Sequence, residues 1–142
     1  MELRFFDTVL RAKKEYSRSL DPICKAWGLT RNELDVLLFL FNNPDLDRAA
    51  DIVTHRGMAK SHVSLSVTNL EARGLLTRQA DPRDRRTVHL KLSQEAENIA
   101  REGRDAQRRF FSRIYRGLTA QELDQWRTSM LKVCNNIDKL DE

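Results

Sequence analysis

The sequence predicts a mainly α-helical fold with one small β-hairpin. Only 5 glycines and 3 prolines interrupt its 142 residues, which indicates long helices joined by short connections. Apolar residues recur at helical spacing toward both ends of the chain. Between residues 75 and 92, two short runs typical of strands flank a turn-forming segment. The length suits one domain, or two small lobes that share a core.

The first two elements are predicted to be helices. Apolar residues keep helical spacing from Leu3 to Trp27, and Gly28 follows as a cap, while Pro22 should kink this helix or start a fresh turn. In the next segment, LTRNELDVLLFLFNNP, Thr30 and Glu33 have the spacing of a capping box. The residues that follow are apolar nearly all round, which indicates a central, buried helix.

Two further helices and the hairpin come next. Leu46–His55 is predicted to be a short helix with Asp47 as its N-cap, and Gly57 allows the tight turn after it. A longer helix from Lys60 has its buried stripe at Val63, Val67 and Leu70. The two strands are then predicted at Leu75–Ala80 and Thr87–Leu92, around the turn Asp81–Arg86.

The chain ends in two more predicted helices. Ser93 caps a long one that reaches about Arg116, and Thr119 with Glu122 opens the last one through a second capping box. Cys134 lies on the apolar side of this last helix, where we expect it to pack. The apolar residues that line this side are Leu123, Trp126, Met130, Val133, Ile137 and Leu140.

The order short helix, glycine turn, longer helix and hairpin is that of a winged helix-turn-helix. Charge is concentrated in the same part of the chain. Residues 54–91 hold 8 Lys or Arg against 3 Asp or Glu, whereas the rest holds 17 against 18. Such a local surplus is typical of a surface that faces a polyanion, although a solvated charged face would also produce it.

The helix from Lys60 is predicted to enter the major groove of duplex DNA. Outside its buried stripe it exposes mostly small hydrogen-bonding side chains and no carboxylate, a surface that does not repel phosphates. A helix face that only contacts solvent more often mixes Glu and Lys. Such a solvated face remains the alternative to a DNA-binding one. The residues predicted to face DNA are Lys60, Ser61, His62, Ser64, Leu65, Thr68 and Asn69.

The hairpin turn is predicted to reach the adjacent minor groove with Arg83, Arg85 and Arg86, because a narrow minor groove has an enhanced negative potential. Asp81 should have a structural role, either by bonding back to the turn backbone or by holding Arg86 rigid. The alternative is an ordinary charged hairpin. His55 and Arg56, which come shortly before the helix from Lys60, are candidates for phosphate contacts.

From about Phe5 to Ile137 the chain resembles the MarR family of bacterial transcription factors. The resemblance rests on GLTRNELDVLLFL, on AKSHVSLSVTNLEARGLL, and on DPRDRRTVHLKLS. The last segment matches the family's D-x-R-D-x-R wing through Asp81, Arg83, Asp84 and Arg86. Leu65 departs from the polar or basic residue that many members have. It could contact a thymine methyl group, or indicate a helix that reads few base edges.

The resemblance implies a homodimer that binds a pseudo-palindromic site in double-stranded DNA and probes successive major grooves about one turn apart. Residues 1–28 and 94–142 would form a helical dimerisation region, and 29–93 the DNA-binding domain. The terminal helices independently favour pairing, because residues such as Phe5, Phe6, Trp126 and Met130 have few partners in one chain.

The resemblance also implies a regulator, most often a repressor, that a small aromatic ligand releases. Its site is not determined by the sequence. Tyr16, Trp27, Phe39 and Phe110 could line a pocket, although aromatic residues at helical spacing usually belong to a core. Some members sense oxidants through a cysteine near the first helix. Cys24, beside Lys25, could be such a thiol or an inert, buried one.

Other function classes find less support. No nucleophile lies at motif spacing from a base, no glycine-rich phosphate loop is present, and no Cys or His spacing suggests a metal, so we expect neither an enzyme nor a bound cofactor. No long apolar run predicts a membrane span, and we expect a cytoplasmic protein. A winged helix that serves as a protein-interaction module remains the alternative, although three wing arginines argue against it.

Overall fold

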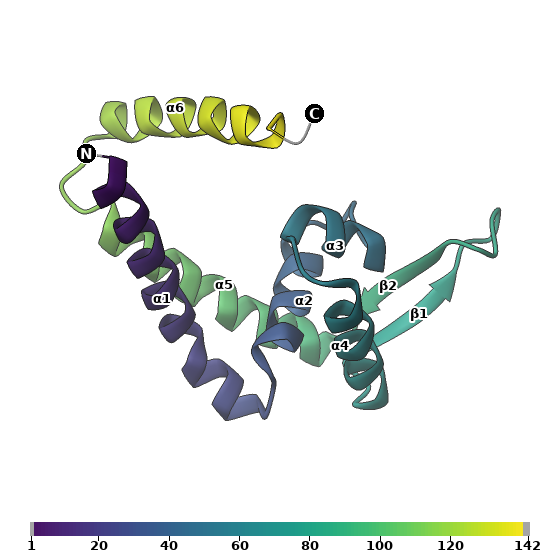
Figure 1. The fold of residues 1–142 in the computed structure, drawn as a ribbon. Coiled ribbons are helices and arrows are strands. Elements are labelled where there is room, and N and C mark those ends of the chain that lie inside the picture. Colours follow the sequence, from purple (N-terminus) through teal and green to yellow (C-terminus); the bar gives the residue numbers. More distant parts are fainter. Residues whose placement is uncertain (1, 141–142) are drawn as a thin grey trace. The chain divides into compact units, whose positions relative to one another are not determined.

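In a computed structural model, which describes residues 2–140, the chain has six α-helices and one two-stranded antiparallel sheet within that range (Figure 1). The predicted fold class, mainly α with a small hairpin, is confirmed. The chain divides into two compact units, one up to residue 108 and the other from residue 109. The elements are α1 (Glu2–Trp27), α2 (Arg31–Asn42), α3 (Ala49–Arg56), α4 (Lys60–Ala72), β1 (Leu76–Ala80), β2 (Val88–Leu92), α5 (Gln94–Ile114) and α6 (Ala120–Asp138).

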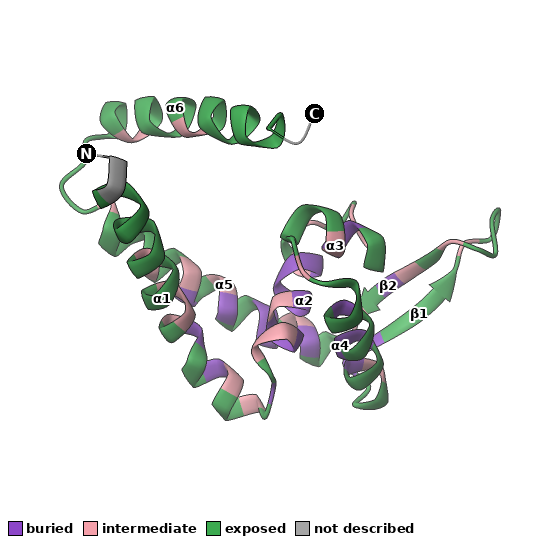
Figure 2. Ribbon diagram, in the orientation of Figure 1, coloured by how far each residue is buried: buried purple, intermediate pink, exposed green. Residues whose placement is uncertain are grey.

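The core of the first unit is built around α2. Leu34 and all of Val36–Leu40 are buried, as the apolar run predicts (Figure 2). Gly103 lets α5 approach this helix, since a Cβ at that position would lie 2.7 Å from Cδ2 of Leu38. The predicted stripe of α4 is buried too, at Val63, Val67 and Leu70.

Both predicted capping boxes are present. The Oγ1 of Thr30 accepts a hydrogen bond from the backbone N–H of Glu33 (3.2 Å), and the Glu33 carboxylate accepts one from the backbone N–H of Thr30 (2.9 Å). Thr119 and Glu122 make the same reciprocal pair at the start of α6, at 3.2 and 2.7 Å. Each box satisfies two backbone donors that a helix N-terminus leaves without an intrahelical partner.

The start of α3 differs from the prediction. Asp47 is not its N-cap; Arg48 occupies that position, and its backbone N–H and guanidinium both donate to the Asp51 carboxylate. Asp47 is held outside the helix because its carboxylate bonds to His89 (2.7 Å) and its carbonyl accepts from the N–H of Leu90 (2.7 Å). A tertiary contact therefore overrides the local preference of Asp for a cap.

Other boundaries shift by one to three residues. Each strand begins one residue later than predicted, so the connecting loop covers residues 81–87, and α5 ends at Ile114. Pro22 does not end α1, which continues to Trp27. None of the helices among the described residues combines the length and apolar content needed to cross a bilayer.

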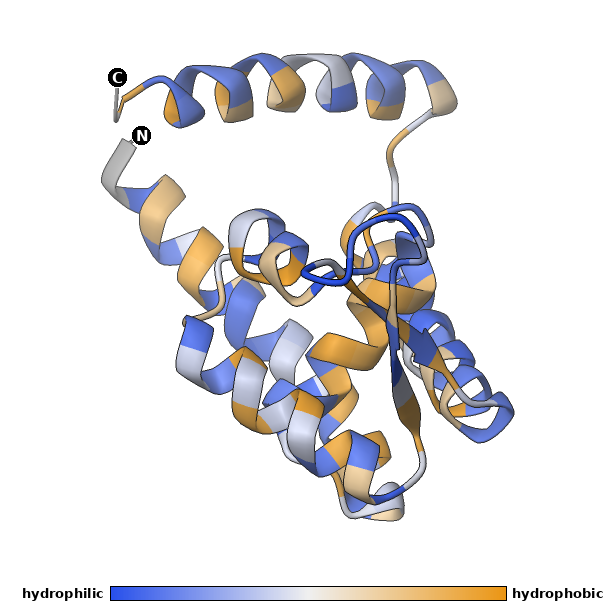
Figure 3. Ribbon diagram, turned by 90° about the vertical axis from the view of Figure 1, so that its right-hand side faces the viewer, coloured by the Kyte–Doolittle hydropathy of each residue, from blue (hydrophilic) through white to orange (hydrophobic). Residues whose placement is uncertain are grey.

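The second unit leaves the apolar side of α6 uncovered within the chain. No residue of α6 is buried, and Trp126, Val133 and Ile137 are exposed. Figure 3 shows orange apolar segments recurring between blue ones along this helix. Cys134 is also exposed, so the single chain does not provide the packing predicted for it.

Candidate nucleic-acid interface

The exposed face of α4 is free of carboxylates over its first three turns. The helix has one acidic residue, Glu71, in its last turn, and Arg78 of β1 pairs with it. Between its buried positions α4 presents Lys60, Ser61, His62, Ser64, Leu65, Thr68 and Asn69, all exposed. The structure therefore places every predicted groove-facing residue on the solvent side of one helix.

The N-terminus of α4 is open toward solvent. Ala59 holds the N-cap position and offers no side-chain hydrogen bond, and the first turn has no acidic residue. Its backbone N–H groups therefore keep their partial positive charge for an external acceptor, beside the ammonium group of Lys60. Gly57, at φ 69°, makes the preceding turn in the left-handed region that glycine adopts without strain.

The two candidates for phosphate contacts at the end of α3 differ. His55 is exposed. Arg56, by contrast, donates a hydrogen bond from its guanidinium to Asp35 of α2 (3.2 Å), with 41% of its side chain exposed. Part of its charge is therefore compensated inside the protein, and its hydrogen bonding is only partly available to a phosphate.

The wing loop, residues 81–87, is folded by its own two aspartates. Oδ1 of Asp81 accepts hydrogen bonds from the backbone N–H of Arg83 (2.7 Å) and of Asp84 (3.3 Å), the pattern of an Asx turn. Asp84 in turn accepts from the N–H of Arg86 (3.0 Å) and from the hydroxyl of Thr87 (3.1 Å). A hydrogen bond from His89 and the bonds from the loop backbone lower the pKa of Asp81, so it stays ionised.

These bonds occupy the carboxylates with backbone groups rather than with arginine side chains. Arg83, Arg85 and Arg86 are exposed, and within the described part of the chain their guanidinium groups form no ion pair. Figure 1 shows the hairpin extending away from the helices, with this loop at its far end. The result is a projecting loop with three exposed arginine side chains that the described residues do not pair.

One contact that the sequence does not reveal ties the hairpin to α4. The guanidinium of Arg78 on β1 donates to Oγ1 of Thr68 (3.3 Å) and pairs with Glu71. The hairpin and α4 are thereby linked by side chains as well as by the core. Arg78 contributes to the basic surplus of this segment, but no spacing rule pairs a strand residue with a helix turn ten positions earlier.

A second unpredicted contact fixes α4 to α2. The side-chain amide of Asn69 donates to Oε1 of Glu33 (3.1 Å), whose other oxygen completes the capping box of α2. Glu33 is only 5% exposed, so this is a nearly buried carboxylate with two hydrogen-bonded oxygens. Asn69, predicted to face DNA, therefore has its amide nitrogen engaged in the fold.

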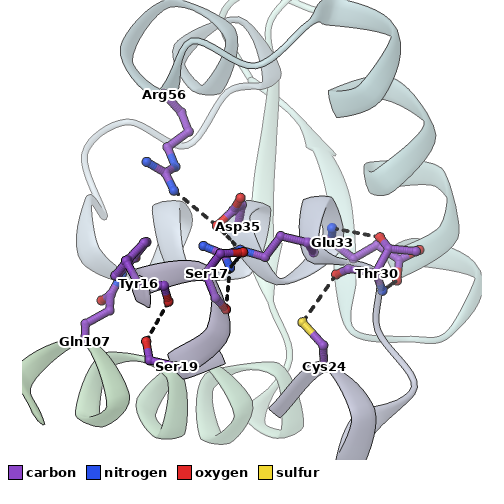
Figure 4. A network of polar contacts seen from close by, with 10 residues as sticks. Tyr16, Ser17, Ser19, Cys24, Thr30, Glu33, Asp35, Arg56 and Gln107 are labelled. Atoms are coloured by element: carbon purple, nitrogen blue, oxygen red, sulfur yellow. Dashed lines mark hydrogen bonds and ion pairs between the residues drawn. The ribbon is translucent and has the colours of Figure 1, made fainter. Parts of the chain in front are cut away.

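A chain of polar contacts joins α1, α2 and α3 (Figure 4). Arg31 donates to the carbonyl and hydroxyl oxygens of Ser17 (3.1 and 3.0 Å) and to Asp35 (3.1 Å), and its guanidinium lies 5.3 Å from the ring centroid of Tyr16. The same Oδ1 of Asp35 accepts from Arg56. The helix-turn-helix is thus anchored to the first helix by charged groups as well as by apolar packing.

The residues considered for a ligand pocket have partners in the fold. Phe39 is 7% exposed and belongs to the core. The Tyr16 hydroxyl accepts a hydrogen bond from Gln107 (2.6 Å), and the indole N–H of Trp27 donates to Glu102 (3.1 Å). Phe110 belongs to the second unit, where it is half-buried and makes an edge-to-face contact with the neighbouring Phe111.

Cys24 does not have the features of an activated thiol. Burial, the largest influence, raises its pKa, although the nearby positive charge of Arg31 acts in the opposite direction. The thiol has one long contact with the carbonyl of Thr30 (3.9 Å) (Figure 4). Since the thiolate is the reactive form, these surroundings favour the inert reading of Cys24.

The groove between α3, α4 and the hairpin contains a cavity of about 440 Å³. Its walls are mainly apolar side chains, including Val53 and Leu90, and Lys60 and Arg78 add positive charge. It lies on the candidate DNA-binding side, because Ser64 of α4 also lines it. Among the described residues no cluster of three metal-ligating side chains occurs.

Comparisons with known proteins agree with this geometry. A sequence model of the MarR family matches residues 27–87, which contain α2, α3, α4, β1 and the wing loop. The chain is similar to the crystal structure of a MarR-family transcriptional regulator from Silicibacter pomeroyi, with 21% identity, 92% of this chain and 87% of that chain covered, and a TM-score of 0.78.

Two further similar structures are of proteins studied with DNA or with a small molecule. A MarR-family regulator from Listeria monocytogenes complexed with 26mer DNA is 17% identical, with a TM-score of 0.80 and coverages of 95% of this chain and 87% of that chain. The other is Bordetella bronchiseptica BpsR, a protein whose DNA binding is regulated by 6-hydroxynicotinic acid. It is 20% identical, with a TM-score of 0.66 and coverages of 94% of this chain and 91% of that chain. The resemblance inferred from the sequence is confirmed, and the winged-helix fold with it.

Proposed function

We propose that this chain, whose residues 27–87 match a sequence model of the MarR family, is a sequence-specific, double-stranded DNA-binding regulator of transcription that acts as a homodimer. The observation that carries the proposal is the pairing of two surfaces within the first unit. One is the carboxylate-free exposed face of α4, and the other is the loop with Arg83, Arg85 and Arg86.

Each surface suits a different part of the duplex. The exposed Ser61, His62 and Ser64 are small enough to approach base edges in a groove roughly 12 Å wide. The uncapped N-terminus of α4 and Lys60 suit phosphates, which position the protein without reading sequence. The wing arginines suit a narrow minor groove, where the negative potential is enhanced.

The homodimer is supported by apolar surface that a single chain leaves exposed. At the beginning of α1, Phe6 and Leu10 are 64% and 65% exposed, and α6 has no buried residue at all. Exposed apolar surface that is continuous along a helix marks an interaction site. Residues 1–28 and 94–142 would form the dimerisation region, whose positions 1, 141 and 142 lie outside the described residues. Equilibrium sedimentation should give twice the chain mass of 16.6 kDa.

We further propose a repressor that a small aromatic acid releases from DNA. The regulation of BpsR by 6-hydroxynicotinic acid supports this kind of ligand. A cavity of about 440 Å³ has the size of a small-molecule site. A thermal-shift screen with aromatic carboxylic acids, followed by DNA competition with any stabilising compound, tests the release. A panel that neither stabilises the protein nor displaces DNA would argue against it.

The test of DNA binding is a salt titration with a duplex of random sequence, followed by fluorescence anisotropy. Each phosphate that the protein neutralises should add about 0.9 to the slope of log affinity against log salt. Arg83→Ala or Arg85→Ala should weaken binding to all sequences and reduce this slope, whereas changes at Ser61 or His62 should alter sequence preference. Absence of binding at low salt would instead favour a protein-interaction module.

A further inference from the structure

We propose that His89 is a positioning residue for DNA binding: by bridging Asp47 and Asp81 as an imidazolium, it holds the arginine loop of the wing against the loop that precedes α3. The inference deepens the proposed function and rests on it for the role of the wing. The bridge itself can be tested on the free protein.

The bridge joins the hairpin, which contains both Asp81 and His89, to the loop before α3, which contains Asp47. Nδ1 of His89 lies 2.7 Å from Oδ1 of Asp47, and Nε2 lies 2.9 Å from Oδ2 of Asp81. The Leu90 N–H donates to the carbonyl of Asp47 (2.7 Å), which fixes strand β2 beside the same loop. All three bridging side chains are close to 30% exposed, so they lie at the surface but are partly shielded from water.

The geometry requires the protonated ring. A neutral imidazole has one N–H and one lone pair, so one of its nitrogens would direct a lone pair at a carboxylate oxygen less than 3 Å away. Only the imidazolium can donate to both aspartates. Hydrogen bonds from His89, first to Asp47 and then to Asp81, raise the pKa of the ring.

The surroundings of the bridge contain few competing charges. Opposite His89 on β1 is the uncharged Gln79. On the side of the α2–α3 loop, Arg48 lies next to Asp47 but pairs with Asp51. From the wing loop, Arg83 and Asp84 reach Asp81 through their backbone N–H groups.

Loss of the proton should loosen the wing. Asp81 accepts hydrogen bonds from the loop backbone and from His89 at the same time, so the bridge connects the arginine loop to the body of the domain. Because the folded-state pKa of His89 is raised, the bridge is complete below the ordinary value of 6.5 and is lost as the pH rises through the raised pKa. DNA affinity should therefore fall over the same pH range.

The first test is an NMR titration of the free protein. The ring signals of His89 should titrate above pH 6.5, with both nitrogens protonated at that pH, and the heteronuclear NOE of residues 83–87 should fall through the same transition. Titration of His89 at or below 6.5, or a loop whose order does not follow it, would overturn the proposal.

The second test compares two variants with the same charge change in the same loop. Asp47→Asn removes one partner of His89, whereas Asp45→Asn removes an exposed carboxylate that makes no contact with it. Asp47→Asn should move the pH midpoint of DNA affinity downward and weaken binding roughly three- to tenfold at a pH between the two midpoints, since the loop must then be ordered on binding. Asp45→Asn should keep the parent midpoint.

Two further outcomes decide the matter. His89→Gln, whose amide does not titrate, should remove the pH transition that Asp47→Asn displaces. Identical pH profiles for the parent, Asp47→Asn and His89→Gln would overturn the positioning role. A chain that binds no duplex at any pH would overturn the proposed function and the wing's part in it, whereas the NMR titration would still decide whether His89 holds the loop.

Discussion

Replacing Glu33 by alanine should destabilise the protein by about 2 kcal/mol, because this side chain serves two elements at once. Loss of the capping box of α2 costs about 1 kcal/mol, and loss of the hydrogen bond from Asn69 costs about another. Removing the one buried γ-methylene group adds roughly 0.8 kcal/mol. The carboxylate's own desolvation cost, which disappears in the variant, offsets part of this total.

Urea unfolding followed by circular dichroism measures this loss. The midpoint should fall while the slope stays unchanged, because the variant alters stability rather than the surface exposed on unfolding. Glu122→Ala is the matched control. It removes the corresponding glutamate from the capping box of α6, where the side chain is exposed and, among the described residues, hydrogen-bonds to Thr119, so its effect should be clearly smaller. Equal losses for the two variants, or a loss below about 1 kcal/mol at Glu33, would refute the reasoning.

Three further predictions follow from individual side chains. Leu70 is fully buried, so Leu70→Ala should cost about 2–5 kcal/mol in urea unfolding, whereas Leu65→Ala, at a position 61% exposed, should change stability by less than about 0.5 kcal/mol. The hydrogen bond from Arg48 holds the pKa of Asp51 below its ordinary 3.8, so the stability from this pair is present above that value and is lost as the pH falls through and below it; Asp51→Asn should flatten the acid side of the curve of urea midpoint against pH. Burial raises the pKa of Cys24, so iodoacetamide at pH 7 should alkylate it more slowly than a small-molecule thiol in a Cys134→Ala background, and faster alkylation would revive the redox-sensing reading.

Local patterns in the sequence predict most of the helices and the hairpin. The spacing of Val63, Val67 and Leu70 identifies the buried side of α4 because a helix repeats every 3.6 residues. Thr30 with Glu33 identifies the start of α2, because the capping box is formed by residues three apart. Such features are encoded by neighbours along the chain, and a single sequence therefore suffices to find them.

The contacts that complete the candidate site are not encoded in this way. Asp47 has the right side chain for an N-cap, yet it bonds to His89, 42 positions away, and α3 begins later than its local sequence suggests. Arg78 reaches Thr68 across two elements, which no periodicity specifies. Periodicity shows which side of an element is exposed, but the partners of exposed polar groups depend on how the elements pack.

The central idea is that α4 and the wing of each protomer read one duplex together in a homodimer. Selection of bound sequences from a random duplex pool, followed by hydroxyl-radical footprinting, tests this idea most directly. The account predicts a pseudo-palindromic site with two half-sites about one helical turn apart, and additional protection of the flanking minor grooves that Arg83→Ala or Arg85→Ala removes. A lone half-site, or flanking minor grooves that are equally unprotected with the parent and with the arginine variants, would contradict it.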